Sequence, residues 1–472
     1  MEESDKSEYK TFQARFDILV DTIRSEIRSG VYREGDFLPS EKAYAKEYRI
    51  SNKTVRQGLE VLVAEGLIEK IARVGNKVTW SKREETAVLR FGCHSSLFSE
   101  ALIHTLIAEF HKQHPEIRVE VFQFTSGFYN YERLHAMISE KSLDVFTMNY
   151  NTLDDFRLYG AMDELETLEP NKEIYPFLTE TAMVNGQLKV QPFVFSPLIL
   201  CYNKDHFREK GLMEPDSSWR WSVLSEHASQ LAVENERLGF YFHFPSTNRW
   251  PVFLLQSGID FKRDASGKIV VNPQQLAESL QACRELIYLQ NHFPLFLSER
   301  DGDAEELFFS EKVSMIMTSY FALNHHERKT NFEYDVAPLP YLNNPKTMLL
   351  LIGLSLNPKS EHKETAKLFM DFLVSPRAQM MLRQRSLSIP SLKPAAEWSG
   401  KETMYRPSRY SMYRDIIPTF QPYTDLNMTA AELNRFYREA KLYWSGIETE
   451  EVAVMRLEQV LNGREAQTSG NK

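Results

Sequence analysis

The sequence has 472 residues, of which 42% are hydrophobic and 26% are charged, and its formal net charge is −9. This composition is typical of a soluble globular protein with two or three domains. Three widely spaced cysteines, Cys93, Cys201 and Cys283, exclude a disulfide framework. The most apolar stretch, around Met348–Leu356, is too short to span a bilayer, and no secretion signal is visible at the start. We therefore expect a cytoplasmic protein.

The charge is distributed unevenly along the chain. Residues 1–83 contain 16 basic and 14 acidic side chains, whereas the remainder contains 40 basic and 51 acidic ones. The N-terminal part is therefore the part that tolerates contact with a polyanion, while the acidic remainder would be repelled by nucleic acid.

Three helices are predicted first. An amphipathic helix covers Phe16–Arg28. Ser40 is placed to cap a helix that runs through Glu47, because Pro39 holds the preceding chain extended and the hydroxyl can accept a hydrogen bond from an orphan amide. After a short turn, Ser51 can cap the third helix in the same way.

The third helix has two different sides. Its apolar residues recur at helical spacing and must face a core: Val55, Leu59 and Leu62. Its first turns place amides and basic side chains on another side: Asn52, Lys53, Arg56 and Gln57. A helix whose N-terminal end presents such groups away from the core is what reading of the DNA major groove requires, so the pattern predicts a helix-turn-helix.

Further positions between residues 16 and 78 fit one pattern. They are Ile23, Ile27, Gly30, Tyr32, Gly35–Asp36, Leu38–Pro39–Ser40–Glu41, Ala45, Tyr48, Ser51, Thr54–Val55–Arg56, Leu59, Leu62 and Glu65–Gly66–Leu67–Ile68. Together they resemble the GntR-type winged helix-turn-helix of bacterial transcription regulators. The resemblance implies a dimer that binds operator DNA, with a wing hairpin after the third helix. It implies these DNA-binding candidates: Ser40, Lys42, Asn52, Lys53, Thr54, Arg56, Arg73, Gly75 and Lys77.

Two positions depart from the GntR pattern. The family usually has Arg where this chain has Asn52, which should shift base preference, because Arg favours guanine and Asn favours adenine. The family's wing usually carries two glycines, and only Gly75 is present here. We therefore expect the wing to contact phosphate through Arg73 or Lys77 rather than enter the minor groove.

Three parts are predicted along the chain. Residues 10–80 form the DNA-binding domain, residues 81–86 form a charged linker without an apolar anchor, and residues 87–465 form a ligand-sensing domain of two lobes. In the last part, strands at Val88–Cys93, Val119–Phe124 and Leu143–Met148 alternate with helices at Ser99–His111 and Tyr131–Glu140. Such alternation predicts an α/β fold with parallel sheets covered on both faces, in which ligands bind at the carboxyl ends of strands.

Several phrases further along resemble the family-1 extracellular solute-binding proteins, the two-lobed (type II) sugar receptors of bacterial uptake systems. They are Gly160–Leu165, Pro192–Gly211, Trp219–Leu224, Phe308–Tyr320, Val336–Pro340, Thr365–Gln379, Ile389–Pro390, and a final helix pair split at Trp444–Gly446 and restarted by Thr449. Their order agrees with the family from residue 88 to residue 463. The missing export signal is the main departure, and it predicts that the receptor works inside the cell.

Sugar receptors need aromatic faces for the C–H surface of the ring and polar groups for its hydroxyls. Loop position gives these ligand-binding candidates: His94, Ser95, Asn149, Tyr150, Asn151, Phe195, Asn248, Trp250, Ser319 and Tyr320. A single aromatic residue at such a position more often packs in the core than binds ligand. We expect at least two of them to face the ligand.

Metal binding and catalysis have little support. His111 and His114, and the pair His325–His326, are more typical of surface histidines than of a zinc site, which would need two further ligands. A second class of GntR-type regulators carries an aminotransferase-like domain, but no lysine, aspartate and phosphate-binding set for pyridoxal phosphate is evident. We expect no cofactor and no enzymatic activity.

The sequence therefore predicts a transcription regulator whose operator affinity is controlled by a small ligand, of which a saccharide is the favoured class, bound between two lobes. The alternative is a cytoplasmic binding module with a degenerate DNA-binding domain that works through protein partners, supported by Asn52 and the altered wing. An aminotransferase-like regulator is the less favoured third possibility.

Overall fold

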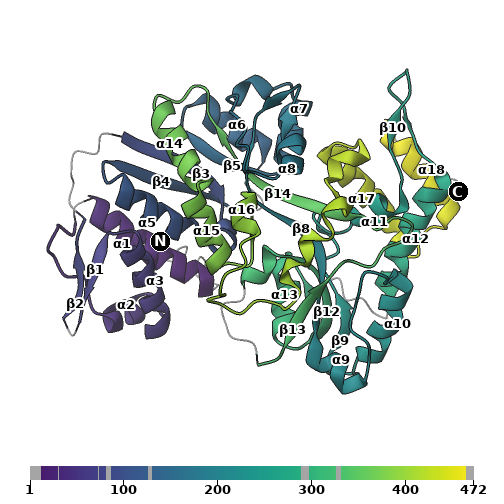
Figure 1. The fold of residues 1–472 in the computed structure, drawn as a ribbon, viewed down its shortest axis with the longest axis horizontal. Coiled ribbons are helices and arrows are strands. Elements are labelled where there is room, and N and C mark those ends of the chain that lie inside the picture. The colour runs from purple at the N-terminus through teal and green to yellow at the C-terminus, as the bar shows by residue number, and fades with distance from the viewer. Residues whose placement is uncertain are drawn as a thin grey trace, which may run out of the picture.

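The computed structural model describes residues 12–29, 31–72, 74–80, 87–125, 130–288, 297–325 and 331–463. Figure 1 shows a small N-terminal unit at one end of the molecule, a larger α/β body beside it, and the C-terminus at the far end of that body. The N-terminal unit, residues 12–80, is called the head below. The linker predicted at 81–86 and the candidate Arg73 lie outside the described residues.

The head consists of three helices and a hairpin: α1 (Phe12–Ser29), α2 (Glu41–Glu47), α3 (Asn52–Ala64), β1 (Ile68–Ile71) and β2 (Gly75–Val78). Both predicted caps are confirmed, because Ser40 Oγ accepts from the amide of Ala43 and Ser51 Oγ accepts from the amide of Thr54. The apolar sides of the helices meet in a core of their own that includes Leu19, Ile23, Val55, Leu59 and Leu62.

The first lobe of the body, lobe 1, begins with a parallel sheet. Its strands and helices up to the second lobe are β3 (Ala87–His94), α4 (Leu97–Glu100), α5 (Ile103–Gln113), β4 (Ile117–Phe124), α6 (Tyr131–Ser139), β5 (Val145–Met148), α7 (Tyr150–Leu158) and α8 (Pro176–Thr181), then the short pair β6 (Met183–Val184) and β7 (Gln187–Leu188). Strand β3 lies between β4 and β5 and is parallel to both. The helix predicted at Ser99–His111 is instead two helices, because Leu102 adopts a left-handed conformation with φ 51°.

Two long strands join lobe 1 to the second lobe, lobe 2. Strand β8 (Gln191–Asn203) is buried along its whole length. Its first half pairs with β14 (Thr347–Leu356), and its second half, from Leu198 onward, pairs with strands of lobe 2. Strand β14 also pairs antiparallel with β5. The central strands are thus antiparallel, which the simple expectation of parallel sheets did not include.

Lobe 2 surrounds the far half of β8. Its strands are β9 (Leu238–Tyr241), β10 (Lys262–Arg263), β11 (Ile269–Val270), β12 (Val313–Ser319) and β13 (Tyr334–Ala337), and its helices are α9 (Lys204–Lys210), α10 (Trp221–Leu231), α11 (Val252–Ser257), α12 (Pro273–Tyr288), α13 (Gly302–Phe309) and η4 (Ala322–His325). The main sheet runs in the order β4-β3-β5-β14-β8-β12-β9, so both lobes share one sheet.

The chain then returns to lobe 1 and finally to lobe 2. The returning elements are α14 (Lys363–Leu373), α15 (Pro376–Arg385), β15 (Ile389–Pro390), α16 (Lys393–Ala396), η5 (Tyr410–Arg414), η6 (Ile417–Thr419), β16 (Phe420–Gln421), η7 (Tyr423–Leu426), α17 (Ala430–Trp444) and α18 (Glu450–Leu461). The predicted restart at Thr449 is confirmed, since Thr449 is the N-cap of α18. Helix α17 begins with a capping box of Thr429 and Glu432.

The head lies against lobe 1 through α3 and α5 (Figure 1). Arg24 of α1 binds both carboxylate oxygens of Glu65, the C-cap of α3, at 2.9 and 2.7 Å. His104 of α5 approaches the same carboxylate at 3.6 Å. Burial lowers the pKa of His104 to about 4, so this imidazole is neutral at pH 7. The guanidinium of Arg118 also lies 5.7 Å from the centre of the Trp80 ring.

A buried histidine in lobe 2 predicts a pH-dependent stability. His206 is 5% exposed and its Nδ1 lies 3.0 Å from Ser314 Oγ. Burial lowers its pKa to about 4, whereas an unfolded histidine titrates near 6.5. Below pH 6.5 the unfolded chain binds a proton that the folded chain does not, so this term costs about 2 kcal/mol of unfolding free energy at pH 5.

We therefore expect His206→Gln to lose less stability than the wild-type protein between pH 7 and pH 5, as measured by urea unfolding at both values. His135→Gln is the control for the substitution itself, because the His135 side chain is 41% exposed. Equal pH dependence in all three proteins would contradict the expectation.

Candidate functional site

The exposed side of α3 is the candidate DNA-reading surface. Asn52, Lys53 and Arg56 are exposed, whereas Val55 and Leu59 on the same helix are buried. The two-sidedness that the sequence predicts is therefore present in the folded head. The amide and basic groups lie in the first turn and a half of the helix, the part that reaches base edges in a helix-turn-helix.

Arg56 already has a partner in the free protein. Its Nη2 lies 2.8 Å from Glu41 Oε2, and its Nε lies 3.2 Å from Glu41 Oε1. The hydrogen bond from Arg56 lowers the pKa of the Glu41 carboxyl. Glu41, the first residue of α2, thus holds the guanidinium of Arg56 on α3. A DNA base or phosphate must compete with this carboxylate for the guanidinium.

The other DNA-binding candidates of the head differ in exposure and in whether their side chains already have partners. Thr54 is 3% exposed and its hydroxyl lies 2.8 Å from Ser51 Oγ, so it is engaged in the cap. Ser40 caps α2 and is exposed, as is Lys42. In the wing, Gly75 has φ 147°, which favours glycine, and Lys77 Nζ lies 3.7 Å from Glu69.

The aromatic ligand candidates are all buried. Tyr150, Phe195, Trp250 and Tyr320 are 5%, 0%, 1% and 0% exposed, and Ser319 is 2% exposed. Each ring has protein partners. In this conformation none of the five offers a surface to a ligand, and the expectation that at least two aromatics face it remains a prediction.

The partners explain this burial. Phe195 meets Tyr413 and Phe420, and the Tyr320 hydroxyl donates to the backbone oxygen of Tyr410 at 2.8 Å. These partners belong to residues 405–423, a segment that we call the strap. The Trp250 ring is stacked on Phe436 at 5.5 Å.

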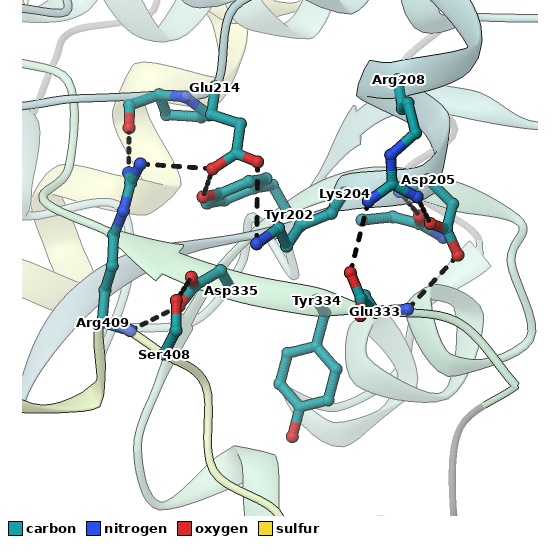
Figure 2. A network of polar contacts seen from close by, with 12 residues as sticks. Tyr202, Lys204, Asp205, Arg208, Glu214, Glu333, Tyr334, Asp335, Ser408 and Arg409 are labelled. Carbon is teal, nitrogen blue, oxygen red and sulfur yellow. Dashed lines mark hydrogen bonds and ion pairs between the residues drawn. The ribbon is translucent and has the colours of Figure 1, made fainter.

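A polar network holds the start of the strap on lobe 2, as Figure 2 shows. Asp335 of β13 is 1% exposed and accepts hydrogen bonds from the Ser408 hydroxyl and from the backbone amide of Arg409. The Arg409 guanidinium lies 3.2 Å from Glu214, which also accepts from the Tyr202 hydroxyl at 2.7 Å. The strap is therefore fixed to lobe 2, while its aromatic rings cover Phe195 of β8 and Tyr320, which follows β12.

The polar ligand candidates are half-buried: His94, Ser95, Asn149, Asn151 and Asn248. Asn149 is used as the N-cap of α7, because its side-chain oxygen accepts from the amide of Thr152 at 3.0 Å. His94 Nδ1 lies 2.8 Å from Ser96 Oγ. His94 and Ser95 lie at the end of β3, and Asn149 and Asn151 follow β5, so these four lie at the carboxyl edge of the parallel strands of lobe 1. Asn248 follows β9 of lobe 2.

A groove of about 230 Å³ lies at the same edge, where β4 ends beside α6, and is lined by Phe124, Thr125 and Arg133 among others. A hollow of larger volume, about 560 Å³, lies at the opposite edge of the sheet, beside Ala87 and Ile117 at the starts of β3 and β4. This larger hollow therefore does not coincide with the predicted ligand site.

Sequence reasoning missed two polar residues where the lobes meet, Asp154 on α7 and Tyr423 on η7. Helix α7 of lobe 1 packs against η7 and α17 of lobe 2. The adjacent acidic residues Asp154 and Asp155, one turn after Asn151, were the available signal. Tyr423 on η7 is distant from them in the sequence, and no sequence pattern indicated that it lies near them.

The described residues contain no group of three or more His, Cys, Asp or Glu side chains arranged to hold a metal ion. His111 Nε2 accepts from the amide of Val119 at 3.1 Å, and His114 lies 3.5 Å from Glu116. His326 lies outside the described residues. No helix in the described part of the chain is long and apolar enough to cross a membrane.

Two family models match the chain. Residues 105–406 match the bacterial extracellular solute-binding proteins, and residues 17–78 match the bacterial regulatory proteins of the gntR family. The chain belongs to the bacterial extracellular solute-binding protein family and carries a GntR-family domain ahead of the solute-binding part. Both resemblances inferred from the sequence are thus confirmed.

Curated relatives include the sn-glycerol-3-phosphate-binding periplasmic protein UgpB of Escherichia coli strain K12 and of Shigella flexneri. Each is 23% identical over 231 residues, which is 47% of this chain and 52% of the relative. The chain therefore spans about half the length of the curated relatives it matches.

Solved structures share the fold of the body. A solute-binding protein of Thermotoga lettingae bound to α-D-tagatose has a TM-score of 0.69 and 18% identity, covering 80% of this chain and 100% of that one. Maltose-bound MalE3 of T. maritima has a TM-score of 0.66 and 20% identity, covering 80% and 99%. Lmo0181 of Listeria monocytogenes with cycloalternan has a TM-score of 0.66 and 18% identity, covering 80% and 98%. The two-lobed α/β fold is confirmed.

Proposed function

We propose that this protein is a cytoplasmic transcription regulator that binds operator DNA as a homodimer and senses a saccharide between its two lobes. The observation that carries the proposal is the covalent union of an exposed, basic α3 surface with a solute-binding body. GntR regulators and solute-binding proteins generally act by binding, so we propose no catalytic step.

Ligand control of DNA binding follows because the head and the two-lobed body belong to one chain and pack against each other. The head lies on α5 of lobe 1, while the ligand would be shared by lobes 1 and 2. A ligand that favours one arrangement of the lobes changes the placement of the two heads in a dimer. It can alter operator affinity only by its differential affinity for the two arrangements, typically about 1–3 kcal/mol.

Three of the matched proteins are described in complex with maltose, α-D-tagatose or cycloalternan, so these compounds are suitable first probes of ligand binding. Thermal unfolding of the purified protein is expected to shift upward with a saccharide and not with amino acids. At 100 times the dissociation constant the stabilisation should be about 2.7 kcal/mol. Operator fragments selected from random DNA then report, by fluorescence anisotropy, whether the same saccharide changes DNA affinity. Failure to select any double-stranded DNA at low salt would refute the regulator function.

A further inference from the structure

Asp154 is buried where lobe 1 meets lobe 2. Asp154 is 8% exposed; burial raises the pKa of its carboxyl, whereas Arg157 and the nearby backbone amide of Ala430, the first residue of α17, lower it. Arg157 Nη1 lies 3.3 Å from Asp154 Oδ1. Its second oxygen, Oδ2, is buried and has no hydrogen-bond partner among the described residues. A lobe 1 side chain thus reaches the N-terminus of a lobe 2 helix with one acceptor left over.

Tyr423 lies on η7, which packs against α7, the helix that carries Asp154. Tyr423 is 4% exposed, and its hydroxyl is also buried without a hydrogen-bond partner among the described residues. Burial, and then the negative charges of Asp154 and Asp155, raises the pKa of Tyr423 well above its usual value. The hydroxyl therefore remains a donor at neutral pH and lies within electrostatic reach of both carboxylates.

Element η7, which carries Tyr423, is anchored on lobe 2. The backbone oxygen of Leu426 accepts from the backbone amide of Phe261, and the side-chain Nδ2 of Asn427 donates to Asp260 Oδ1 at 2.7 Å. Asp154 and Tyr423 therefore move apart when the lobes separate, and water can then satisfy both. When the lobes close they are buried again, and either the Tyr423 hydroxyl donates directly to Asp154 Oδ2 or a ligand group bridges the two.

The chemistry of that group is constrained. A hydroxyl group can donate to Asp154 Oδ2 and accept from the Tyr423 hydroxyl at the same time. Burial, the charge of Asp154 and the charge of Glu132 raise the pKa of Asp155 to about 6, which reports a negative local field. A phosphate dianion brings only acceptors and further negative charge, so it is unsuited to this place.

We propose that Asp154 and Tyr423 bind a hydroxyl group of an uncharged polyhydroxylated effector across the lobe boundary, and that the carboxylates of Asp154 and Asp155 repel a phosphate group held close to that hydroxyl, as in sn-glycerol-3-phosphate. The inference rests on the proposed sensing function and deepens it by naming two binding residues and the ligand class. It separates this chain from the sn-glycerol-3-phosphate-binding proteins that it partly matches in sequence.

The test uses the full-length protein with a panel of neutral saccharides and polyols that includes maltose and D-tagatose, and with sn-glycerol-3-phosphate. Binding is measured by thermal shift and then by isothermal titration calorimetry. We expect at least one neutral compound to bind and sn-glycerol-3-phosphate to give no shift. Tyr423→Phe and Asp154→Asn should each weaken that binding at least tenfold. Asp163→Asn, an exposed acidic residue of the same lobe, is the control and should bind like wild type.

Several results would overturn the inference: no binding by any neutral compound, binding of sn-glycerol-3-phosphate, or unchanged affinity in Tyr423→Phe. If Asp154 only stabilises the N-terminus of α17, Asp154→Asn would lower the melting temperature while leaving ligand affinity unchanged, which also counts against it. Tyr423→Phe removes one oxygen and keeps the ring, so it serves if Asp154→Asn fails to fold. Operator binding without ligand is measured separately, so loss of the sensing assignment and loss of the DNA-binding assignment are distinguishable.

Discussion

Arg56→Ala is expected to weaken binding of the full-length protein to its operator by about 5- to 150-fold, which is about 1–3 kcal/mol. Arg56 is the exposed guanidinium in the first turns of α3. Replacing it removes a side chain that can bind guanine or phosphate and leaves the buried face of the helix untouched. Fluorescence anisotropy at fixed salt measures the change, because phosphate contacts make all such affinities salt-dependent.

A substitution at Glu41 is expected to change operator affinity in the opposite direction. In the free protein the Glu41 carboxylate holds Arg56 at 2.8 Å, and it also repels the DNA backbone. Glu41→Gln should therefore raise operator affinity. Arg438→Ala, an exposed arginine on α17 of lobe 2, is the control. Unchanged affinity in Arg56→Ala would favour a head that has lost DNA reading and works through protein partners.

Glu65→Gln is expected to destabilise the head by about 2–3 kcal/mol, because it leaves the guanidinium of Arg24 without its bidentate partner. The side chains of Arg24 and Glu65 are only 15% and 12% exposed, and breaking a buried ion pair from one side is costly. Hydrogen exchange of the α3 amides, read by mass spectrometry, resolves this change from the stability of the body.

Asp21→Asn is the matched control for Glu65→Gln. Asp21 also pairs with Arg24, but its side chain is 67% exposed, and exposed ion pairs contribute little. We expect α3 exchange in Asp21→Asn to match wild type within about twofold. Equal effects of the two variants would show that the buried position of Glu65 carries no special weight.

The sequence was sufficient to predict the head because its signals are local. Ser40 and Ser51 specify two helix starts through contacts three residues away, and the apolar spacing of α3 specifies its buried side. The order of strands and helices in lobe 1 follows from periodicity in the same way. The left-handed Leu102 between α4 and α5 had no such signal, since leucine is a good helix former.

The candidate ligand site was harder to predict because it depends on distant contacts. The loops after β5, β9 and β12 lie where the topology places them, yet their aromatic residues are covered by residues far along the chain. Tyr410 and Tyr413 cover Tyr320, and Phe436 covers Trp250. The strap is held by Asp335 and Glu214, whose pairing with Ser408 and Arg409 spans more than seventy residues. Periodicity carries no information about such pairings.

The shared sheet also has a consequence for synthesis on the ribosome. The head is built from one contiguous stretch, so it can fold as soon as residue 80 has emerged. Lobe 1 must wait, because β14, which pairs with β5 and β8, comes from residues 347–356. Lobe 2 in turn needs α17 and α18 at the end of the chain. A nascent or truncated chain would therefore carry a folded GntR-type head before the solute-binding body is complete, and under the proposed function that head would not yet respond to ligand.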